Sequence, residues 1–438
     1  SKLSNGGVAS SIGDSSSAAG NLVINGGTLR YTGTGDSTDR ELTVGTAGAT
    51  LDASGSGAVN FTSAAATTLA GTNTARTLVL RGTNTGTNTL SAVLGDNGTG
   101  VTTVNKEDVG RWVLDGASTF TGVTNVNAGA LRLSNSNALG STTGGTTVAS
   151  GAALEMTGGI TVGAEALSLS GNGLATDGAL HNLSGSNTYG GEITLAADSR
   201  IQSDAGLLTL DVASGNAITG TTQNVTFAGA GDITVSDAIA TGTGGLTKEG
   251  LGTLILGGSN TYTGATNVNA GTLIVTGSLA ATSNDITLAD NAILSGTGTI
   301  GGDGVLNGDL RIGATAANGS VGTLTFTDSG APNPGVGFGS TSTWLVDLVE
   351  GTNSSDTLVV EGALTIDSSA ALSFNVVIGT PYSLSSKYTL ATYSVGTLTG
   401  AFAGYSNNTV YTIGGGDYLF KYDDLGGTAI TLTAVPEP

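Results

Sequence analysis

Short strings of alternating apolar and polar residues recur along the chain, separated by glycine, asparagine or aspartate. Examples are TLVL at 77–80, LSLS at 167–170 and TLTF at 323–326. Alternation of this kind between turn-forming residues is typical of β-strands. Because no stretch shows a sustained apolar stripe at helical spacing, we expect almost no α-helix.

One long segment occurs twice, at an offset of 142 residues. Residues 106–133 have the sequence KEDVGRWVLDGASTFTGVTNVNAGALRL, residues 248–275 have KEGLGTLILGGSNTYTGATNVNAGTLIV, and 15 of these 28 positions are identical. A partial copy lies at 185–195 and a shorter echo at 25–30. Repeats of this kind point to a solenoid, in which each coil is one structural unit.

Two architectures suit a chain of many short strands. Parallel pairing within one sheet normally needs a covering helix, and the sequence predicts none. The alternatives are therefore an antiparallel sandwich and a solenoid whose strands stack coil on coil. Because the sequence repeats, we predict an all-β parallel β-helix, that is, a β-solenoid.

The composition changes near residue 331. All five prolines lie beyond residue 330, as expected if the preceding backbone N–H groups pair in ladders. We predict a polar segment at 1–20 as a candidate assembly arm, a solenoid at 21–330 and a β-rich C-terminal cap region at 331–438, with APNPG at 331–335 as a linker or bulged turn. The aromatic residues expected to cover the end of the solenoid core are Trp344, Phe374, Tyr388, Phe402 and Phe420.

Charge and composition exclude several classes of protein. The 438 residues include 13 basic and 33 acidic ones, for a net charge of −20, which argues against nucleic-acid binding. The chain has no cysteine and one histidine, so thiol chemistry and zinc sites built on several histidines are excluded. Since no run approaches the length of a membrane-spanning helix, we expect no stable membrane insertion.

The repeated segments resemble the autotransporter-associated β-strand repeat of bacterial passenger proteins. The resemblance is strongest for NTYTG at 260–264 followed by NAGTL at 269–273. TGTIGGDG at 297–304 and GTLTF at 322–326, followed by a W-x-V-D-L motif from Trp344 and an S-D-x-L-x-V motif from Ser355, are similar to the closing part of such a passenger. The resemblance implies a right-handed parallel β-helix.

The last four residues, VPEP at 435–438, are similar to the start of a PEP-CTERM sorting signal. In that family a hydrophobic helix and a basic tail follow, and a membrane protease called exosortase removes them. The resemblance implies an exported protein of bacteria that make extracellular polysaccharide.

The repeat motif has a structural interpretation and a functional one. Asparagines at the turns are expected to adopt left-handed conformations and to form ladders with threonines. Tyr262 and the equivalent Phe120 are expected to stack or to cover an edge, with glycan contact by an exposed tyrosine row as the alternative. The side chains expected to fill the interior are Leu254, Leu256, Val268, Leu273 and Val275.

Candidate chemistry is sparse. Lys106 with Glu107, and Lys248 with Glu249, are predicted to be solvated surface ion pairs, because a catalytic pair need not recur. His181 is the only available imidazole, and no G-x-S-x-G motif accompanies it. Acidic oxygens allow a calcium site, although GGDG at 301–304 and GGGD at 414–417 fit turns better. We predict no catalytic, cofactor-binding or metal-ligating residues.

These observations favour a secreted, non-enzymatic structural protein of a bacterial cell surface or biofilm matrix. Self-association into filaments is the expected partnership, with exopolysaccharide as a further candidate partner. One alternative is a glycan-binding adhesin of the matrix, and a second is a β-helix polysaccharide lyase or hydrolase.

Overall fold

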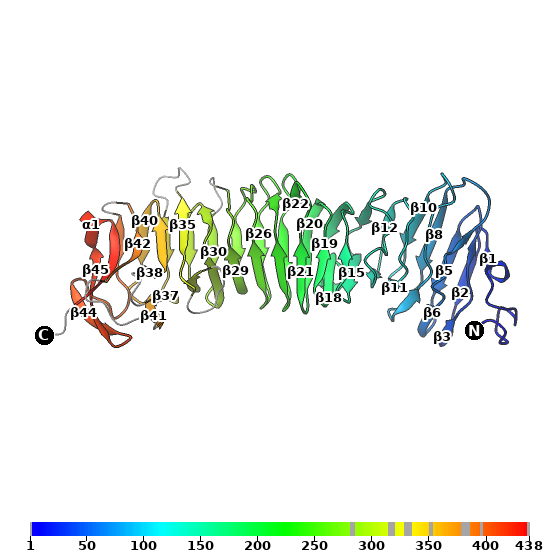
Figure 1. The fold of residues 1–438 in the computed structure, drawn as a ribbon, viewed down its shortest axis with the longest axis horizontal. Coiled ribbons are helices and arrows are strands. Elements are labelled where there is room, and N and C mark those ends of the chain that lie inside the picture. Colours follow the sequence, from blue (N-terminus) through cyan, green and yellow to red (C-terminus); the bar gives the residue numbers. More distant parts are fainter. Residues whose placement is uncertain are drawn as a thin grey trace. The chain divides into compact units, whose positions relative to one another are not determined.

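β-Strands dominate the computed structural model, which describes residues 2–280, 285–313, 320–327, 335–349, 354–377, 386–394 and 397–435. Strands of successive coils pair in parallel, so the predicted all-β parallel β-solenoid is confirmed (Figure 1). Within these ranges the helical elements are short, namely α1 (Asp424–Gly427), η1 (Ala19–Asn21) and η2 (Leu174–Thr176). The chain forms two compact units, Ser1–Thr219 and Gly220–Pro438, which are described separately.

Two main parallel ladders build the first unit, and both run into the long strand β20 (Ile193–Ser203). The first ladder consists of β2 (Thr28–Tyr31), β5 (Ala49–Ala53), β8 (Arg76–Arg81), β10 (Thr102–Lys106), β12 (Thr124–Val126), β14 (Thr146–Val148), β17 (Leu167–Gly171), β20 and β22 (Asn216–Thr219). The second consists of β3 (Thr34–Thr38), β6 (Gly57–Phe61), β9 (Asn88–Leu90), β11 (Arg111–Leu114), β13 (Ala130–Leu133), β15 (Ala153–Thr157), β18 (Leu180–Ser184) and β20. Two shorter ladders consist of β1 (Val23–Ile24), β4 (Thr43–Val44) and β7 (Thr68–Leu69), and of β16 (Thr161–Val162), β19 (Asn187–Tyr189) and β21 (Leu207–Leu210).

Three ladders build the second unit, which also contains β25 (Ala238–Ala240). The first consists of β23 (Val225–Ala228), β26 (Leu246–Lys248), β28 (Thr266–Val268), β30 (Ile286–Leu288), β33 (Gly304–Leu306), β36 (Gly335–Phe338), β40 (Ala363–Ile366) and β43 (Leu398–Gly400). The second consists of β24 (Asp232–Val235), β27 (Thr253–Leu256), β29 (Gly271–Val275), β31 (Ala292–Gly296), β34 (Asp309–Ile312), β37 (Thr343–Val349) and β41 (Ala371–Val377), with β38 (Ser354–Ser355) antiparallel to β37. The third consists of β32 (Thr299–Gly301), β35 (Thr323–Thr327), β39 (Thr357–Val360) and β42 (Lys387–Thr392), followed by the antiparallel strands β46 (Ala429–Ala434), β45 (Gly416–Asp423) and β44 (Thr409–Ile413).

The interior consists of columns of apolar side chains in register between coils. Because side chains alternate along a strand, every second residue points inward, and the same column continues in the next coil. In the first unit one such column contains Leu51 and Leu80, which are paired in register and fully buried. The predicted interior residues of the second repeat copy are all completely buried: Leu254, Leu256, Val268, Leu273 and Val275.

Residues 2–20 of the N-terminal segment pack against the first coil of the solenoid. The buried Arg40 side chain donates hydrogen bonds to the carbonyl oxygens of Ser4 (3.3 Å) and Gly13 (3.1 Å) and to the hydroxyl of Ser15 (3.0 Å). The segment thus lies on its own coil, which was the alternative to an assembly arm. Self-association into filaments stays a prediction, because a single chain does not test it.

The C-terminal region is a mixed sheet, as the predicted β-rich cap requires. The chain passes from parallel pairing, β39 with β42, to antiparallel pairing of β42 with β46. Four of the five predicted covering aromatics are at most 2% exposed, whereas Phe374 is half-buried and contacts the Tyr405 ring at 5.8 Å. The four buried rings are Trp344, Tyr388, Phe402 and Phe420.

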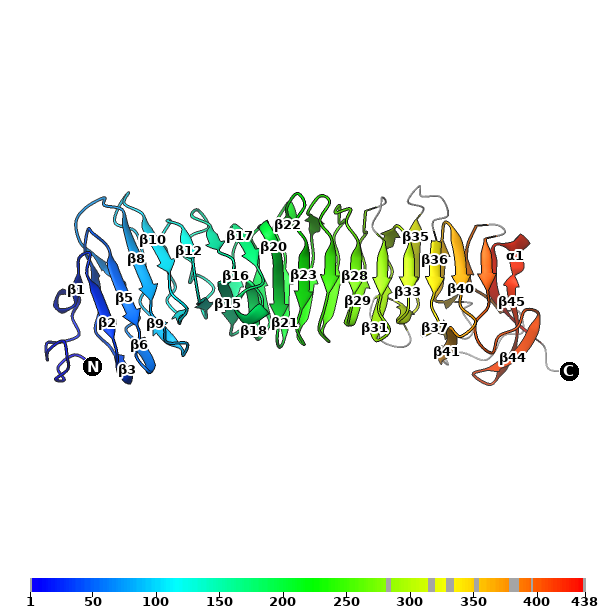
Figure 2. The same ribbon diagram turned by 180° about the vertical axis from the view of Figure 1, so that it is seen from behind.

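The predicted linker at 331–335 falls largely on residues 331–334, which lie outside the described residues, as do 436–438 of the VPEP sequence. The first ladder of the second unit continues beyond this point, from β33 to β36 and β40 (Figure 2). Parallel stacking therefore extends into the region assigned to the C-terminal cap. The domain limits drawn from composition stay a prediction.

Candidate functional site

The repeat lysines are buried, so the prediction of solvated surface ion pairs was wrong. Lys106 is 0% exposed and Lys248 is 3% exposed. Lys106 stands in register with Leu80 and Val126, in an otherwise aliphatic interior column. The spacing from Val104 already placed Lys106 on the inward phase of its strand, and this was the signal available in the sequence.

Each lysine binds three backbone carbonyl oxygens at a turn. The Lys106 ammonium donates to the carbonyls of Glu107 (2.6 Å), Asp108 (2.7 Å) and Ala128 (2.9 Å). Ala128 belongs to the next coil, so the ammonium connects two successive turns. An ammonium group has three N–H donors, and here each one is used.

The second copy has the same arrangement. Lys248 donates to the carbonyls of Glu249 (2.8 Å), Gly250 (2.7 Å) and Ala270 (3.3 Å). Burial lowers the pKa of both Lys106 and Lys248 to about 8, so both ammonium groups remain charged near neutral pH. We refer to each of these sites as a lysine clamp.

Glycine, and not asparagine, takes the left-handed conformation beside each clamp. Gly129 and Gly271, from the NAG sequences, have φ values of 65° and 70°. A Cβ atom at Gly271 would lie 2.4 Å from the Gly250 carbonyl oxygen and 2.8 Å from the Lys248 ammonium nitrogen. The expectation of left-handed repeat asparagines was therefore wrong, because close approach of the next turn requires glycine.

The clamped turns hold apolar side chains in solvent. Val109 is 62% exposed and Leu251 is 82% exposed, and both occupy the same position in the two copies. Val109 directly follows Asp108, whose carbonyl oxygen accepts a hydrogen bond in the first clamp. Leu251 directly follows Gly250, whose carbonyl oxygen does the same in the second clamp. The repeat thus presents one apolar residue on a turn that a buried charge fixes.

The aromatic residues of the repeat are not on the surface, where the alternative of a glycan-contacting tyrosine row would need them. Tyr262, Phe120 and Tyr189 are all 0% exposed, so neither edge coverage nor glycan contact by these rings is supported. The Tyr262 hydroxyl is hydrogen-bonded to the Thr266 hydroxyl at 2.8 Å. In the first copy phenylalanine replaces the tyrosine, and the buried hydroxyl of the equivalent Thr124 has no hydrogen-bond partner.

Asparagine side chains do connect coils, as predicted. The Asn125 amide donates to the side-chain oxygen of Asn105 in the preceding coil at 2.9 Å. Asn260 accepts a hydrogen bond from the Ile239 backbone (2.9 Å) and donates to the Ser278 carbonyl (3.0 Å). These contacts support a structural role for the repeat asparagines.

His181 lies in a polar row on β15, β18 and β20 that no pattern in the sequence predicted. Its Nε2 is 2.8 Å from a carboxylate oxygen of Asp204, and the ring is 5% exposed. The adjacent Glu155, paired in register with His181, accepts two hydrogen bonds from Arg111 (both 2.9 Å) and one from Arg132 (2.8 Å). Because these pairs join residues that are 23 to 44 positions apart in the sequence, only knowledge of the register would have revealed them.

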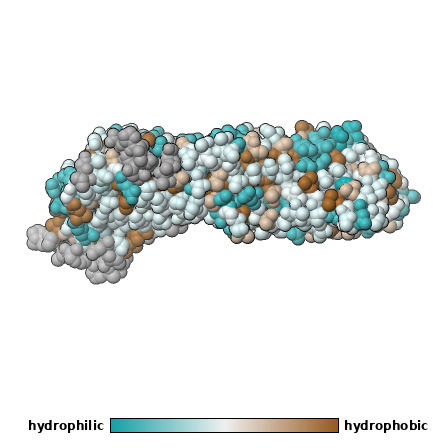
Figure 3. Space-filling model, turned by 90° about the horizontal axis from the view of Figure 1, so that it is seen from above, coloured by the Kyte–Doolittle hydropathy of each residue, from teal (hydrophilic) through white to brown (hydrophobic). Residues whose placement is uncertain are grey.

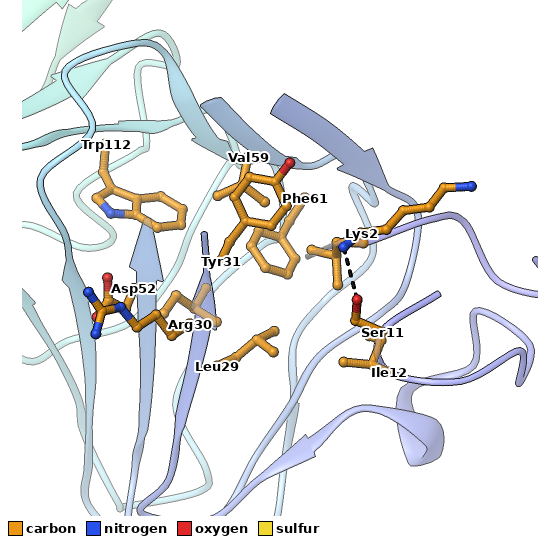
Figure 4. Close-up of a pocket in the computed structure, with 12 residues that line it drawn as sticks. Lys2, Ser11, Ile12, Leu29, Arg30, Tyr31, Asp52, Val59, Phe61 and Trp112 are labelled. Carbon is orange, nitrogen blue, oxygen red and sulfur yellow. Dashed lines mark hydrogen bonds and ion pairs between the residues drawn. The ribbon is translucent and has the colours of Figure 1, made fainter. Parts of the chain in front are cut away.

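A small apolar cavity lies between the N-terminal segment and the first coils (Figure 4). Its volume is about 30 Å³, which is the space of about one water molecule. The rings of Tyr31, Phe61 and Trp112 line one side and Ile12 and Leu29 the other. At this size the cavity is a packing defect under the N-terminal cover rather than a ligand site.

The described residues contain no group of three or more histidine, aspartate or glutamate side chains arranged to hold a metal ion. Asp303 of GGDG accepts a hydrogen bond from the Gly335 backbone (2.7 Å), and Asp417 of GGGD accepts one from the Thr412 hydroxyl (2.6 Å). Asp303 thus connects two coils, and Asp417 lies in β45 opposite Thr412 of β44. Calcium binding stays untested.

On the face shown in Figure 3, outside the grey atoms, most of the surface has intermediate hydropathy. Apolar and strongly hydrophilic residues form small scattered groups on this face. Within the described part of the chain, no helix has the length and apolar character needed to cross a membrane.

Comparison with known proteins places the two repeat copies in a family. Residues 104–133 and 246–275 match the passenger-associated-transport-repeat, which confirms the resemblance to autotransporter passenger repeats. A stretch of 151 residues is 54% identical to the adhesin BmaC autotransporter of Brucella suis biovar 1 (strain 1330). This stretch covers 34% of the chain and only 4% of that adhesin. The homology implies a bacterial protein of the outer surface or one that is secreted. The similarity of VPEP to a sorting signal stays a prediction.

Proposed function

We propose that this chain is an adhesive, non-enzymatic module of a passenger-type protein, displayed on a bacterial surface or released from it. The observation that carries the proposal is the 54% identity over 151 residues to an autotransporter adhesin. The repeat match at 104–133 and 246–275 supports the same class of protein. Among the alternatives drawn from the sequence, the adhesin is favoured over the fibre subunit.

The proposed contact elements are the exposed apolar residues on the turns that the lysine clamps hold. Adhesion benefits from contact groups that are rigid before binding, because less conformational freedom is then lost. Val109 and Leu251 are exposed apolar residues on turns fixed by a buried ammonium group. Two equivalent contacts in one chain also allow multivalent attachment, which strengthens binding without new contact types.

A bead assay tests the proposal. Latex beads coated with the purified chain are washed over cultured epithelial cells, and the retained beads are counted against albumin-coated beads. We expect retention above the albumin level, and a clear loss for the Val109→Ser/Leu251→Ser double variant. Val305→Ser is the matched control, because Val305 is 52% exposed but lies outside the two repeat copies. Retention equal to albumin would contradict the adhesive function.

A binding role is proposed in preference to polysaccharide cleavage. His181, the single imidazole, is buried and held by Asp204, an arrangement that supports a structural role. The test is a reducing-end and unsaturated-product assay on acidic and neutral polysaccharides. Turnover that survives repurification and disappears in a His181→Gln variant would replace this proposal with an enzymatic one.

A further inference from the structure

A step in the first unit interrupts the regular stacking of coils. The short ladder β1–β4–β7 ends at β7, and the next coil contributes only an isolated bridge between Ala66 and Val93. Beyond that bridge the chain forms a tight hairpin, in which Asn97 and Gly100 exchange both backbone hydrogen bonds at 3.0 Å. A concave surface results where the short ladder ends and the next coil has no strand to continue it.

This step contains a groove of about 420 Å³. Volumes of this order match those of small-molecule sites in proteins. The groove combines small apolar side chains with a few polar ones, and its members lie on the β7 segment, on the hairpin and on the following coil. They include Ala66, Thr67, Leu69, Val93, Asp96, Asn97 and Thr119.

The polar groups of the groove are fixed before any ligand binds. The two carboxylate oxygens of Asp96 accept hydrogen bonds from the backbone N–H groups of Thr102 (2.7 Å) and Thr121 (3.0 Å). The Asn97 amide donates to the carbonyls of Leu69 (2.9 Å) and Gly71 (3.0 Å). The Thr121 hydroxyl also donates to Oδ2 of Asp96 at 2.6 Å, so that oxygen accepts two hydrogen bonds. Oδ1 accepts one of the hydrogen bonds named here and retains one acceptor position, because a carboxylate has about four.

The hairpin itself is tied to the preceding coil. The Asn73 backbone donates to the Asn97 side-chain oxygen (2.9 Å), and the Thr99 backbone donates to the Asn73 side-chain oxygen (3.0 Å). Asn73 adopts a φ of 52°, which is uncommon for a residue other than glycine. These reciprocal bonds hold the wall of the groove in place.

We propose that this groove binds an uncharged saccharide through its hydroxyl groups. Asp96 supplies acceptors for sugar hydroxyl donors, and the small apolar side chains of Ala66, Leu69 and Val93 suit the C–H face of a sugar ring. No lysine or arginine lines the groove among the described residues, and the chain carries a net charge of −20, so acidic sugars are disfavoured. Saccharide binding by the groove would explain how the chain adheres, so its biological role rests on the proposed adhesive function. The binding itself does not depend on that function.

Isothermal titration calorimetry with neutral gluco-, galacto- and manno-oligosaccharides tests the proposal, with oligogalacturonate as the acidic counterpart. We expect at least one neutral sugar to bind with a dissociation constant in the millimolar range or better, and oligogalacturonate to bind more weakly. Ala66→Tyr and Thr119→Tyr fill the groove from exposed positions and should weaken binding about tenfold or more. Thr287→Tyr, at an exposed position of β30 in the other unit, is the matched control and should bind as the parent does.

Asp96→Asn tests whether binding depends on the hydrogen-bond acceptors of Asp96 and not only on the volume of the groove. It keeps the shape of the side chain but replaces one acceptor oxygen by an amide donor, so neutral sugar binding should fall while the unfolding temperature, measured in parallel, tests folding. Absence of neutral sugar binding, preference for oligogalacturonate, or unchanged binding by both tyrosine variants would each overturn the proposal. The bead assay is scored separately: parent beads that bind sugar but are not retained on cells would remove the adhesive function and leave the groove assignment standing.

Discussion

At the scale of single residues, each lysine clamp depends on one buried charge. Replacement of Lys248 by methionine leaves three carbonyl oxygens without their donor and removes a contact between two coils. Because buried unpaired polar groups are costly, we expect Lys248→Met to lower the free energy of unfolding by about 2–4 kcal/mol. Urea denaturation followed by circular dichroism measures the change.

Lys421→Met is the control for that substitution, since Lys421 is a half-buried lysine of β45 and not part of a clamp. It removes the same charge and should change stability by less than about 0.5 kcal/mol, as most substitutions away from buried networks do. Equal losses in both variants would mean that the ammonium–carbonyl contacts contribute nothing specific.

The aromatic position of the repeat allows a reciprocal exchange. Tyr262→Phe removes the partner of the Thr266 hydroxyl and should lower stability by about 1 kcal/mol. Phe120→Tyr supplies a partner to the buried, unsatisfied Thr124 hydroxyl and should raise stability by a similar amount, about 1 kcal/mol. Thermal denaturation of the two variants and the parent gives the comparison, and a loss in Phe120→Tyr would show that the first copy has no room for the hydroxyl.

The clamps also predict a dependence of stability on pH. The pKa values of Lys106 and Lys248 are lowered to about 8 in the folded chain, whereas an unfolded lysine titrates near about 10.4. Between these pH values the unfolded chain binds more protons than the folded chain. The free energy of unfolding therefore increases, and the folded state becomes more stable, as pH rises from about 8 to about 10.4. The difference in unfolding free energy between the parent and Lys106→Met/Lys248→Met, measured by urea titration from pH 7.5 to 10, should grow with pH; a constant difference would contradict it.

At the scale of elements, sequence reasoning succeeded where the signal is periodic. The alternation of Leu254 and Leu256, and of Leu273 and Val275, directly predicts which side chains face the interior. The prediction failed for Lys106 and Tyr262. Both side chains are of polar types that usually lie on the surface, although their positions in the alternating pattern face the interior. The hydrogen bonds that satisfy them come from turn conformations and from the register between coils, which a pattern within one strand does not contain.

The turns of the repeat are the elements where glycine is required. Gly271→Ala combines a positive φ with a Cβ atom 2.4 Å from the Gly250 carbonyl oxygen, so we expect a loss of more than about 3 kcal/mol. Gly151→Ala is the matched control: its φ of 82° is also positive, but its Cβ would meet no atom within 4 Å. The control should lose only about 1–2 kcal/mol from backbone strain.

Chemical denaturation of both glycine variants separates the two effects. If Gly271→Ala and Gly151→Ala lose the same stability, the close approach between successive turns does not limit side-chain size there. The alanine at Gly271 should additionally displace the Lys248 ammonium, so its effect and that of Lys248→Met should not be additive, as expected for residues in contact.

At the scale of the whole molecule, the ladder edges decide how copies can meet. An exposed strand edge is a template for pairing with another chain, and proteins usually cover it. Here residues 2–20 lie over the first coil, held by Arg40. In the C-terminal sheet the parallel ladder ends at β42, which continues into the antiparallel strands β46, β45 and β44. The candidate site at the hairpin step was not visible in the sequence, since it depends on which ladder ends at β7.

The cover over the first coil favours a monomer, in place of the filaments expected from the sequence. The full chain should be monomeric over a wide range of concentrations, and deletion of residues 2–20 should produce association, because it exposes the edge of the first coil and the apolar lining that contains Leu29 and Phe61. Since the deletion leaves the C-terminal strands unchanged, we expect two deleted chains to meet through the same newly exposed surface, which gives a closed dimer and not an open filament. Multi-angle light scattering after gel filtration measures the mass, and Arg40→Met should shift the equilibrium partway by loosening the cover. Filaments formed by the full chain and lost on deletion would instead establish residues 1–20 as an assembly arm, and a deleted chain that stays monomeric would show that the first coil does not need its cover.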